Sequence, residues 1–122
     1  MAKLLIVDDE NDVLEFAANF FRKRKVEVVT ASSGEEALTR IETEKPCLVM
    51  LDIKMTAMDG IETLRKIRVT NKDLKVIMVS GKKPEEDDAC IVCRNLGALD
   101  YIHKPLQMEE LERVVMGILK LS

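Results

Sequence analysis

Short runs of apolar, often β-branched residues alternate along this chain with segments of helical period, and this alternation most limits the possible fold. It is typical of a parallel sheet with helices on both faces. The first, third and fourth runs are nearly all apolar, as buried central strands are, whereas the second and fifth are expected nearer the edges. The predicted strands are Leu4–Val7, Val26–Ala31, Leu48–Leu51, Val76–Val79 and Tyr101–His103.

Three segments carry apolar residues at the spacing of one helix face. Ser33 followed by Glu36 predicts a capping box that opens the second helix, and Gly60 and Pro84 mark the starts of the third and fourth. Because the length suits one core, we expect a single domain over residues 1–122. The predicted buried faces are Val13, Phe16, Ala17 and Phe20, then Ala89, Val92, Cys93 and Leu96, then Leu111, Val114, Val115 and Ile118.

Charge and hydropathy exclude several classes of protein. The 122 residues carry a formal net charge of -3, with 19 basic and 22 acidic residues and no long basic run. This argues against nucleic-acid binding through phosphate neutralisation. No apolar stretch approaches the roughly 18 residues that span a bilayer, and the N-terminus lacks the layout of a signal peptide. We therefore expect a cytoplasmic protein without membrane contact, whose three cysteines are reduced thiols.

Polar residues follow four of the predicted strands. Asp8 and Asp9 come after the first strand, Asp52 after the third, Ser80 after the fourth and Lys104 after the fifth. The carboxyl ends of parallel strands form the ligand site of an open sheet, so these side chains are expected in one crevice. Close carboxylates repel one another unless a cation lies among them, and ligands that are all oxygen suit Mg²⁺. The lysine and the hydroxyl add the charge and donor that a transferring phosphoryl group requires.

The segments IVDDE, LDIKMTAMDG, VSG and YIHKP, in this order and spacing, resemble the receiver domain of bacterial two-component response regulators, similar to chemotaxis regulators. The resemblance covers the whole chain. It implies an α/β, flavodoxin-like fold: a doubly wound five-stranded parallel sheet of order 2-1-3-4-5, with five helices. It also implies that Asp52 accepts the phosphoryl group and that Lys104 and Ser80 assist. The implied ligands of Mg²⁺ are Asp9, Asp52, the backbone carbonyl of Lys54 and, through water, Asp8.

The same resemblance implies partners and a switch. The phosphoryl donor would be a phosphohistidine on a sensor histidine kinase or a histidine phosphotransfer protein. Ser80 and Tyr101 match the switch positions, and a downstream target or a fused output domain would contact the fourth helix, fifth strand and fifth helix. The peptide bond from Lys104 to Pro105 is expected to be cis. Lys54 and Lys82 match positions that tune the phosphoryl lifetime, and two lysines there should shield the group and slow its decay.

Two other function classes compete with a phosphoacceptor. A phosphatase with an aspartyl nucleophile usually has a second acid two residues on, but here Asp52 is followed by Ile53 and Lys54. An interaction module that has lost the chemistry would lack an acid, the acceptor or the lysine, and none is missing. We therefore expect the domain to catalyse only its own phosphorylation and autodephosphorylation.

The remaining motifs are interpreted as structural. Thr56 stands where the resembling family usually has proline, which should leave that loop freer. Cys90 and Cys93 form a C-x-x-C inside a helical pattern, where Cys93 belongs to the buried face, so a redox or zinc site is disfavoured. His103 is interpreted as an edge-strand residue.

Overall fold

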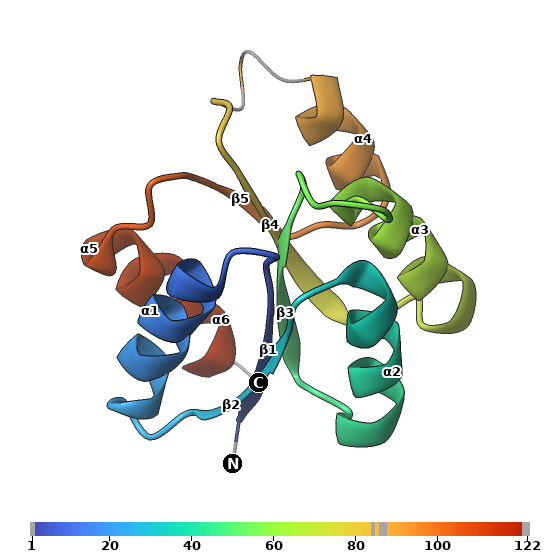
Figure 1. The fold of residues 1–122 in the computed structure, drawn as a ribbon. Coiled ribbons are helices and arrows are strands. Elements are labelled where there is room, and N and C mark those ends of the chain that lie inside the picture. The colour runs from blue at the N-terminus through green and yellow to red at the C-terminus, as the bar shows by residue number, and fades with distance from the viewer. Residues whose placement is uncertain (1, 84, 86–87, 121–122) are drawn as a thin grey trace.

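The computed structural model describes residues 2–83, 85 and 88–120, and within them one parallel sheet has the order β2-β1-β3-β4-β5 (Figure 1). This confirms the predicted order and the two edge strands. The strands are β1 (Lys3–Val7), β2 (Glu27–Ala31), β3 (Leu48–Asp52), β4 (Lys75–Ser80) and β5 (Asp100–His103). The helices between them are α1 (Asn11–Arg22), α2 (Gly34–Glu44), α3 (Gly60–Thr70) and α4 (Asp88–Asn95).

The fifth helical segment follows β5 and has a wider middle turn. It consists of α5 (Met108–Glu110), the π-helical η2 (Leu111–Met116) and α6 (Gly117–Lys120) in direct succession. Three residues of its predicted face, Leu111, Val114 and Val115, are buried, whereas Ile118 is only partly buried and Leu119 is buried as well.

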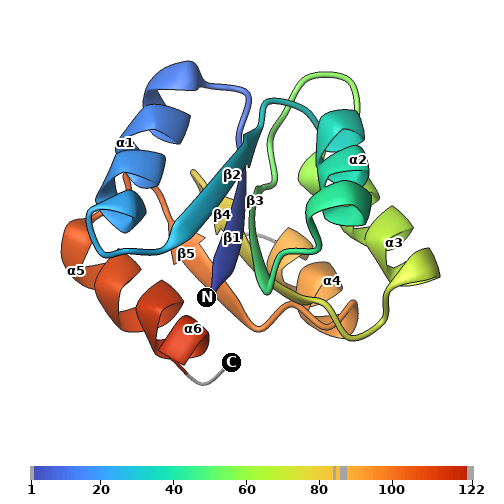
Figure 2. The same cartoon turned by 90° about the horizontal axis from the view of Figure 1, so that it is seen from below.

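The helices form two layers around the sheet. Figures 1 and 2 show α1 and the C-terminal helical segment on one face, and α2, α3 and α4 on the other. Side chains alternate along each strand, so Leu4 and Ile6 join the first core cluster while Leu5 and Val7 join the second. The central strands are therefore buried on both sides, which explains their nearly continuous apolar sequence.

The predicted face of α1 is only partly correct. Ala17 and Phe20 are buried, but Phe16 is 44% exposed, and Leu14, Ala18 and Phe21 are buried instead. The helix carries apolar residues around more than half of its circumference, so the periodicity alone allows two neighbouring faces. Packing against the sheet selects the face that contains Phe21.

The helix starts agree with the sequence where the structure describes them. The Ser33 side chain accepts a hydrogen bond from the Glu36 backbone N–H, and α3 begins at Gly60 after the N-cap Asp59. A Cβ at Gly60 would overlap the Asp52 carbonyl and lie 2.7 Å from the Cα of Ile53, so only glycine allows this close approach. Pro84 lies outside the described residues. Among the helices that are described, none is long and apolar enough to cross a membrane.

Candidate functional site

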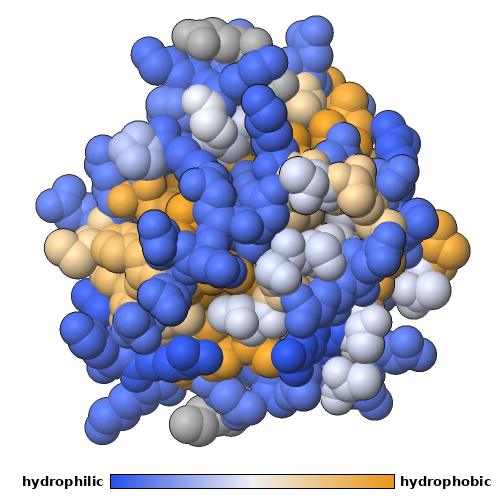
Figure 3. Space-filling view, viewed as in Figure 1, coloured by the Kyte–Doolittle hydropathy of each residue, from blue (hydrophilic) through white to orange (hydrophobic). Residues whose placement is uncertain are grey.

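The predicted site residues meet at the carboxyl ends of the strands. Asp8 follows β1, Asp52 ends β3, Ser80 ends β4 and Lys104 follows β5. The register pairs Asp52 with Val79 and Ser80 with His103, which brings these strand ends to one edge of the sheet. In Figure 3 hydrophilic side chains cover the middle of this region, with hydrophobic surface over α1 and α5 on one side and over α4 on the other.

Lys104 connects the acids of this edge. Its Nζ lies 2.9 Å from Asp8 Oδ2, 3.3 Å from Asp52 Oδ2 and 3.6 Å from Glu10 Oε1. Asp8 and Asp52 are only 2% and 3% exposed. One ammonium therefore bridges two buried carboxylates that come from different strands, and the cis peptide bond to Pro105, as expected, follows it directly.

The charges of the site shift one another's protonation. The pKa of Asp52 is raised from 3.8 to about 6, chiefly by burial and then by the negative charge of Asp8, while Lys104 opposes the shift. Burial also acts to lower the pKa of Lys104, but its hydrogen bond with Asp8 and the charge of Asp52 outweigh burial, and the pKa lies above its ordinary value. The site thus has too little positive charge for its carboxylates, and a bound cation would relieve this.

Oxygen ligands for a metal ion gather beside this bridge. One carboxylate oxygen each of Asp8, Asp9 and Glu10 lies within 4.8 Å of the others. A set made only of oxygen atoms suits a hard divalent ion such as Mg²⁺. The predicted ligands overlap this group in Asp8 and Asp9, whereas Asp52 directs Oδ2 toward Lys104 and Lys54 is exposed.

Two contacts of the site were missed from the sequence. Glu10, the third acid of the VDDE segment, contacts Lys104 and joins the oxygen cluster. The Thr56 backbone N–H donates to Asp9 Oδ2 over 3.2 Å, so the loop is tied to the acids at the residue where we expected it to be freer. A proline there has no N–H and could not make this bond. A run of three acids was the available signal for Glu10; nothing in the sequence indicated the Thr56 bond.

The loop after β4 is held by two side chains of β5. The Tyr101 hydroxyl donates to the Lys82 carbonyl over 3.1 Å, and His103 Nε2 lies 3.1 Å from the Gly81 carbonyl. Ser80 Oγ accepts from the Lys82 backbone N–H, also over 3.1 Å. The loop therefore connects the end of β4 at the site to the half-buried Tyr101.

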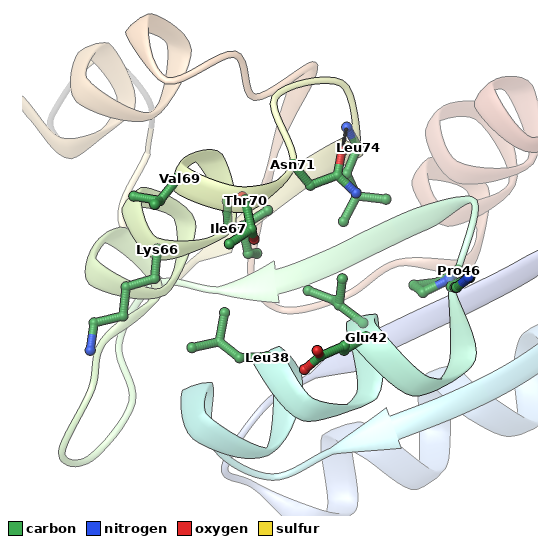
Figure 4. Close-up of a pocket in the computed structure, with 11 residues that line it drawn as sticks. Leu38, Glu42, Pro46, Lys66, Ile67, Val69, Thr70, Asn71 and Leu74 are labelled. Atoms are coloured by element: carbon green, nitrogen blue, oxygen red, sulfur yellow. Dashed lines mark hydrogen bonds between the residues drawn. The ribbon is translucent and has the colours of Figure 1, made fainter.

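A large cavity lies away from these residues. A hollow of ≈ 690 Å³ between α2 and α3 is lined by residues such as Leu38, Glu42, Lys66 and Val69 (Figure 4). It contains none of the predicted site residues. Chemistry, rather than cavity size, locates the candidate site at the acids and Lys104.

Known proteins resemble this chain throughout its length. The family model for the response regulator receiver domain matches residues 4–116. The chain is 37% identical over 120 residues to the alkaline phosphatase synthesis transcriptional regulatory protein PhoP of Bacillus subtilis, covering 98% of this chain and 49% of that protein. It is 34% identical over 120 residues to sporulation initiation phosphotransferase F of the same organism, covering 98% of this chain and 95% of the relative. The chain thus spans about half the length of PhoP.

Solved structures agree with these relatives. A response regulator receiver domain protein from Methanospirillum hungatei matches with a TM-score of 0.90 and 31% identity, over 99% of this chain and 95% of that one. The response regulator protein TrrA from Thermotoga maritima, in complex with Mg²⁺-BeF, matches with a TM-score of 0.84 and 31% identity, over 98% and 100%.

Proposed function

The chain belongs to the response regulator receiver domain family, and on that premise we propose that Asp52 accepts a phosphoryl group from a phosphohistidine of a sensor histidine kinase or a histidine phosphotransfer protein. The observation that carries the proposal is the Lys104 bridge between buried Asp8 and Asp52 at the carboxyl edge of the sheet. An acceptor carboxylate beside a fixed cation is what phosphoryl transfer requires.

In the proposed reaction an Asp52 oxygen attacks phosphorus in line, the P–N bond to the donor histidine breaks, and the histidine leaves with its electron pair. With a pKa of about 6, Asp52 is about 90% ionised at pH 7 and therefore a competent nucleophile. Lys104 neutralises charge on the phosphoryl oxygens. Mg²⁺, when bound, supplies further neutralisation. Asp9, Asp52, the carbonyl of Lys54 and, through water, Asp8 would hold it, and Glu10 is a further candidate because its carboxylate lies with those of Asp8 and Asp9.

The rest of the proposal concerns turnover and signalling. The domain would act only on itself, through phosphorylation and autodephosphorylation, in the cytoplasm where histidine kinases use ATP. Ser80 would move toward the phosphoryl group, and its contact with the Lys82 N–H gives that motion a route to Tyr101. The surface formed by α4, β5 and the C-terminal helical segment would then engage a downstream target or a fused output domain. The domain itself would bind neither nucleic acid nor membrane.

The test is phosphorylation by acetyl phosphate with Mg²⁺, followed by intact-protein mass spectrometry. We expect one phosphoryl group on the wild type and none on Asp52→Asn. Asp59→Asn, in the loop after β3, is a matched control. Asparagine at this N-cap can still accept the hydrogen bond that the Glu62 backbone N–H donates to Asp59. Asp9→Ala should lose the labelling that depends on Mg²⁺. Undiminished labelling of Asp52→Asn would refute the acceptor.

The switch is tested separately with beryllofluoride, a phosphoryl mimic. Amide signals of residues 88–120 are expected to move when Mg²⁺ and beryllofluoride are added, because the α4–β5 surface changes its packing. If only signals near Asp52 move, the domain is a phosphoacceptor without this switch.

A further inference from the structure

A second chemically distinctive place lies between α4 and the last two strands. A cavity of ≈ 300 Å³ is lined there by eight residues, and none of them belongs to the acid site. Cys90 and Cys93 of α4 both line it, and Cys93 is also buried in the core, as the sequence indicated. Met78 of β4, Arg94 of α4, and Asp100 and Tyr101 of β5 line it as well.

The spacing of the two thiols suits a bridging atom better than a disulfide. Cys90 and Cys93 are 6% and 1% exposed and lie three residues apart in one helix, hence on one face. Such positions place Cβ atoms about 5–6 Å apart, whereas a disulfide needs about 3.8 Å. The thioether of Met78 in β4, fully buried, lines the same cavity. Three side chains that carry sulfur, from α4 and β4, thus line one small space.

We propose that this cavity is a binding site for a soft metal ion, copper(I), held by Cys90 and Cys93 with Met78 as a third ligand. Thiolate and thioether sulfur select copper(I) over harder ions. Zinc is less suited, because its structural sites use four ligands and no histidine occurs among the lining residues. The carboxylate of Asp100 is exposed, and its Oδ1 already accepts the Tyr101 backbone N–H over 2.8 Å.

Charge balance supports a monovalent ion. On binding, the two thiols release their protons to solvent, and two thiolates with one copper(I) carry a net charge of -1. Arg94 Nη2 lies 3.9 Å from Cys90 Sγ, in hydrogen-bond geometry, so a guanidinium is already in contact with the sulfur. A buried charge is tolerated when a partner neutralises it.

The site would have a consequence for signalling. Tyr101 lines the cavity and also donates its hydroxyl to the Lys82 carbonyl. A metal ion held by α4 and β4 would fill the space beside the ring and restrict its movement. Binding itself does not depend on phosphorylation of Asp52, so the two proposals stand or fall separately.

The experiment is an anaerobic titration of the whole chain with copper(I) buffered by bicinchoninate. We expect one equivalent to bind and to change the tyrosine emission, because Tyr101 is the only tyrosine and there is no tryptophan. Cys90→Ser and Cys93→Ser should each weaken binding about a hundredfold, and Met78→Leu about tenfold. Replacing even the groups that support a metal's ligands lowers the affinity for the metal about 10- to 100-fold. Cys47→Ser is the matched control, because Cys47 lies outside the cavity, and it should bind as the wild type does.

A measurement on the wild type alone guards against variants that fail to fold. X-ray absorption spectroscopy of the copper(I)-loaded wild type should show two or three sulfur ligands and no nitrogen or oxygen ligand. A copper(I) ion without sulfur ligands, unchanged binding in both cavity variants, or tighter binding of Zn²⁺ than of copper(I) would each overturn the proposal. Asp52→Asn should bind copper(I) like the wild type, which keeps this result distinct from that of phosphorylation.

Discussion

Replacing Asp52 with asparagine is expected to stabilise the metal-free protein at pH 7. Burial and the charge of Asp8 raise the pKa of Asp52 to about 6 in the folded protein, against an ordinary value of 3.8. The folded state therefore holds this proton more tightly than the unfolded state does. The stability that the protonated carboxyl contributes is complete below about pH 3.8 and is lost as the pH rises through 6.

The size of the effect follows from the shift. The pKa of Asp52 in the folded protein lies about two pKa units above its ordinary value. This difference corresponds to about 3 kcal/mol of unfolding free energy, because one pKa unit is about 1.4 kcal/mol. Solvent at the open side of the site screens part of this, which leaves about 1–3 kcal/mol. Asparagine has nearly the same shape, cannot ionise, and leaves Lys104 paired with Asp8 at 2.9 Å.

Urea denaturation followed by circular dichroism measures the difference. Wild type and Asp52→Asn are compared from pH 4 to pH 7.5 with EDTA present, and the advantage of the variant should grow with pH and level off above pH 6. Asp12→Asn, at an exposed acid in the first turn of α1, is the control and should slightly lower stability at pH 7 through the helix dipole. If the wild type is as stable as Asp52→Asn at pH 7, Lys104 fully compensates the burial of the charge. That result would refute the claim that ionised Asp52 destabilises the metal-free protein.

Three further changes test other parts of the site. Gly60→Ala should destabilise the fold by about 2 kcal/mol or more in urea denaturation, because its Cβ meets the Asp52 backbone; an effect below about 0.5 kcal/mol would contradict the contact. Lys104→Met should slow labelling by acetyl phosphate at pH 7 at least about tenfold, because one bridging cation is lost; equal rates would exclude its role. Lys54→Asn with Lys82→Glu should speed phosphate release, since both lysines are exposed and able to cover the phosphoryl group, and an unchanged lifetime would refute shielding.

The convergence of the candidate residues could be predicted from sequence because it depends on the order of the strands. In a parallel sheet every strand ends at the same edge, so Asp8, Asp52, Ser80 and Lys104 needed only correct strand positions to converge. The central strands were identifiable because burial on both faces leaves almost no polar residue in them. Predicting that these residues converge requires no knowledge of side-chain geometry. The chemical role expected of each residue came from the family resemblance.

The contacts that escaped prediction depend on geometry that periodicity does not contain. The face of α1 was ambiguous because neighbouring faces are both apolar, and the sheet left Phe16 exposed. The bond from Thr56 to Asp9 involves a backbone N–H, which any residue except proline carries, so residue identity gave no signal. Cys93 is buried in the core as the pattern indicated, but the cavity that it lines with Cys90 arises from how α4 rests on the sheet.

The route from Asp52 to the α4–β5 surface limits how strongly phosphorylation can drive the proposed switch. It runs through two hydrogen bonds at Lys82, one to Ser80 Oγ and one from the Tyr101 hydroxyl. Each contributes about 0.5–1.5 kcal/mol net, so together they shift a two-state equilibrium by about 5- to 150-fold. A change from 1:99 to 99:1 requires about 5.5 kcal/mol. At least about 2.5 kcal/mol of such a change must therefore come from other contacts, and the contacts of the phosphoryl group itself and the packing of the Tyr101 ring beside the cavity that it lines are the available sources.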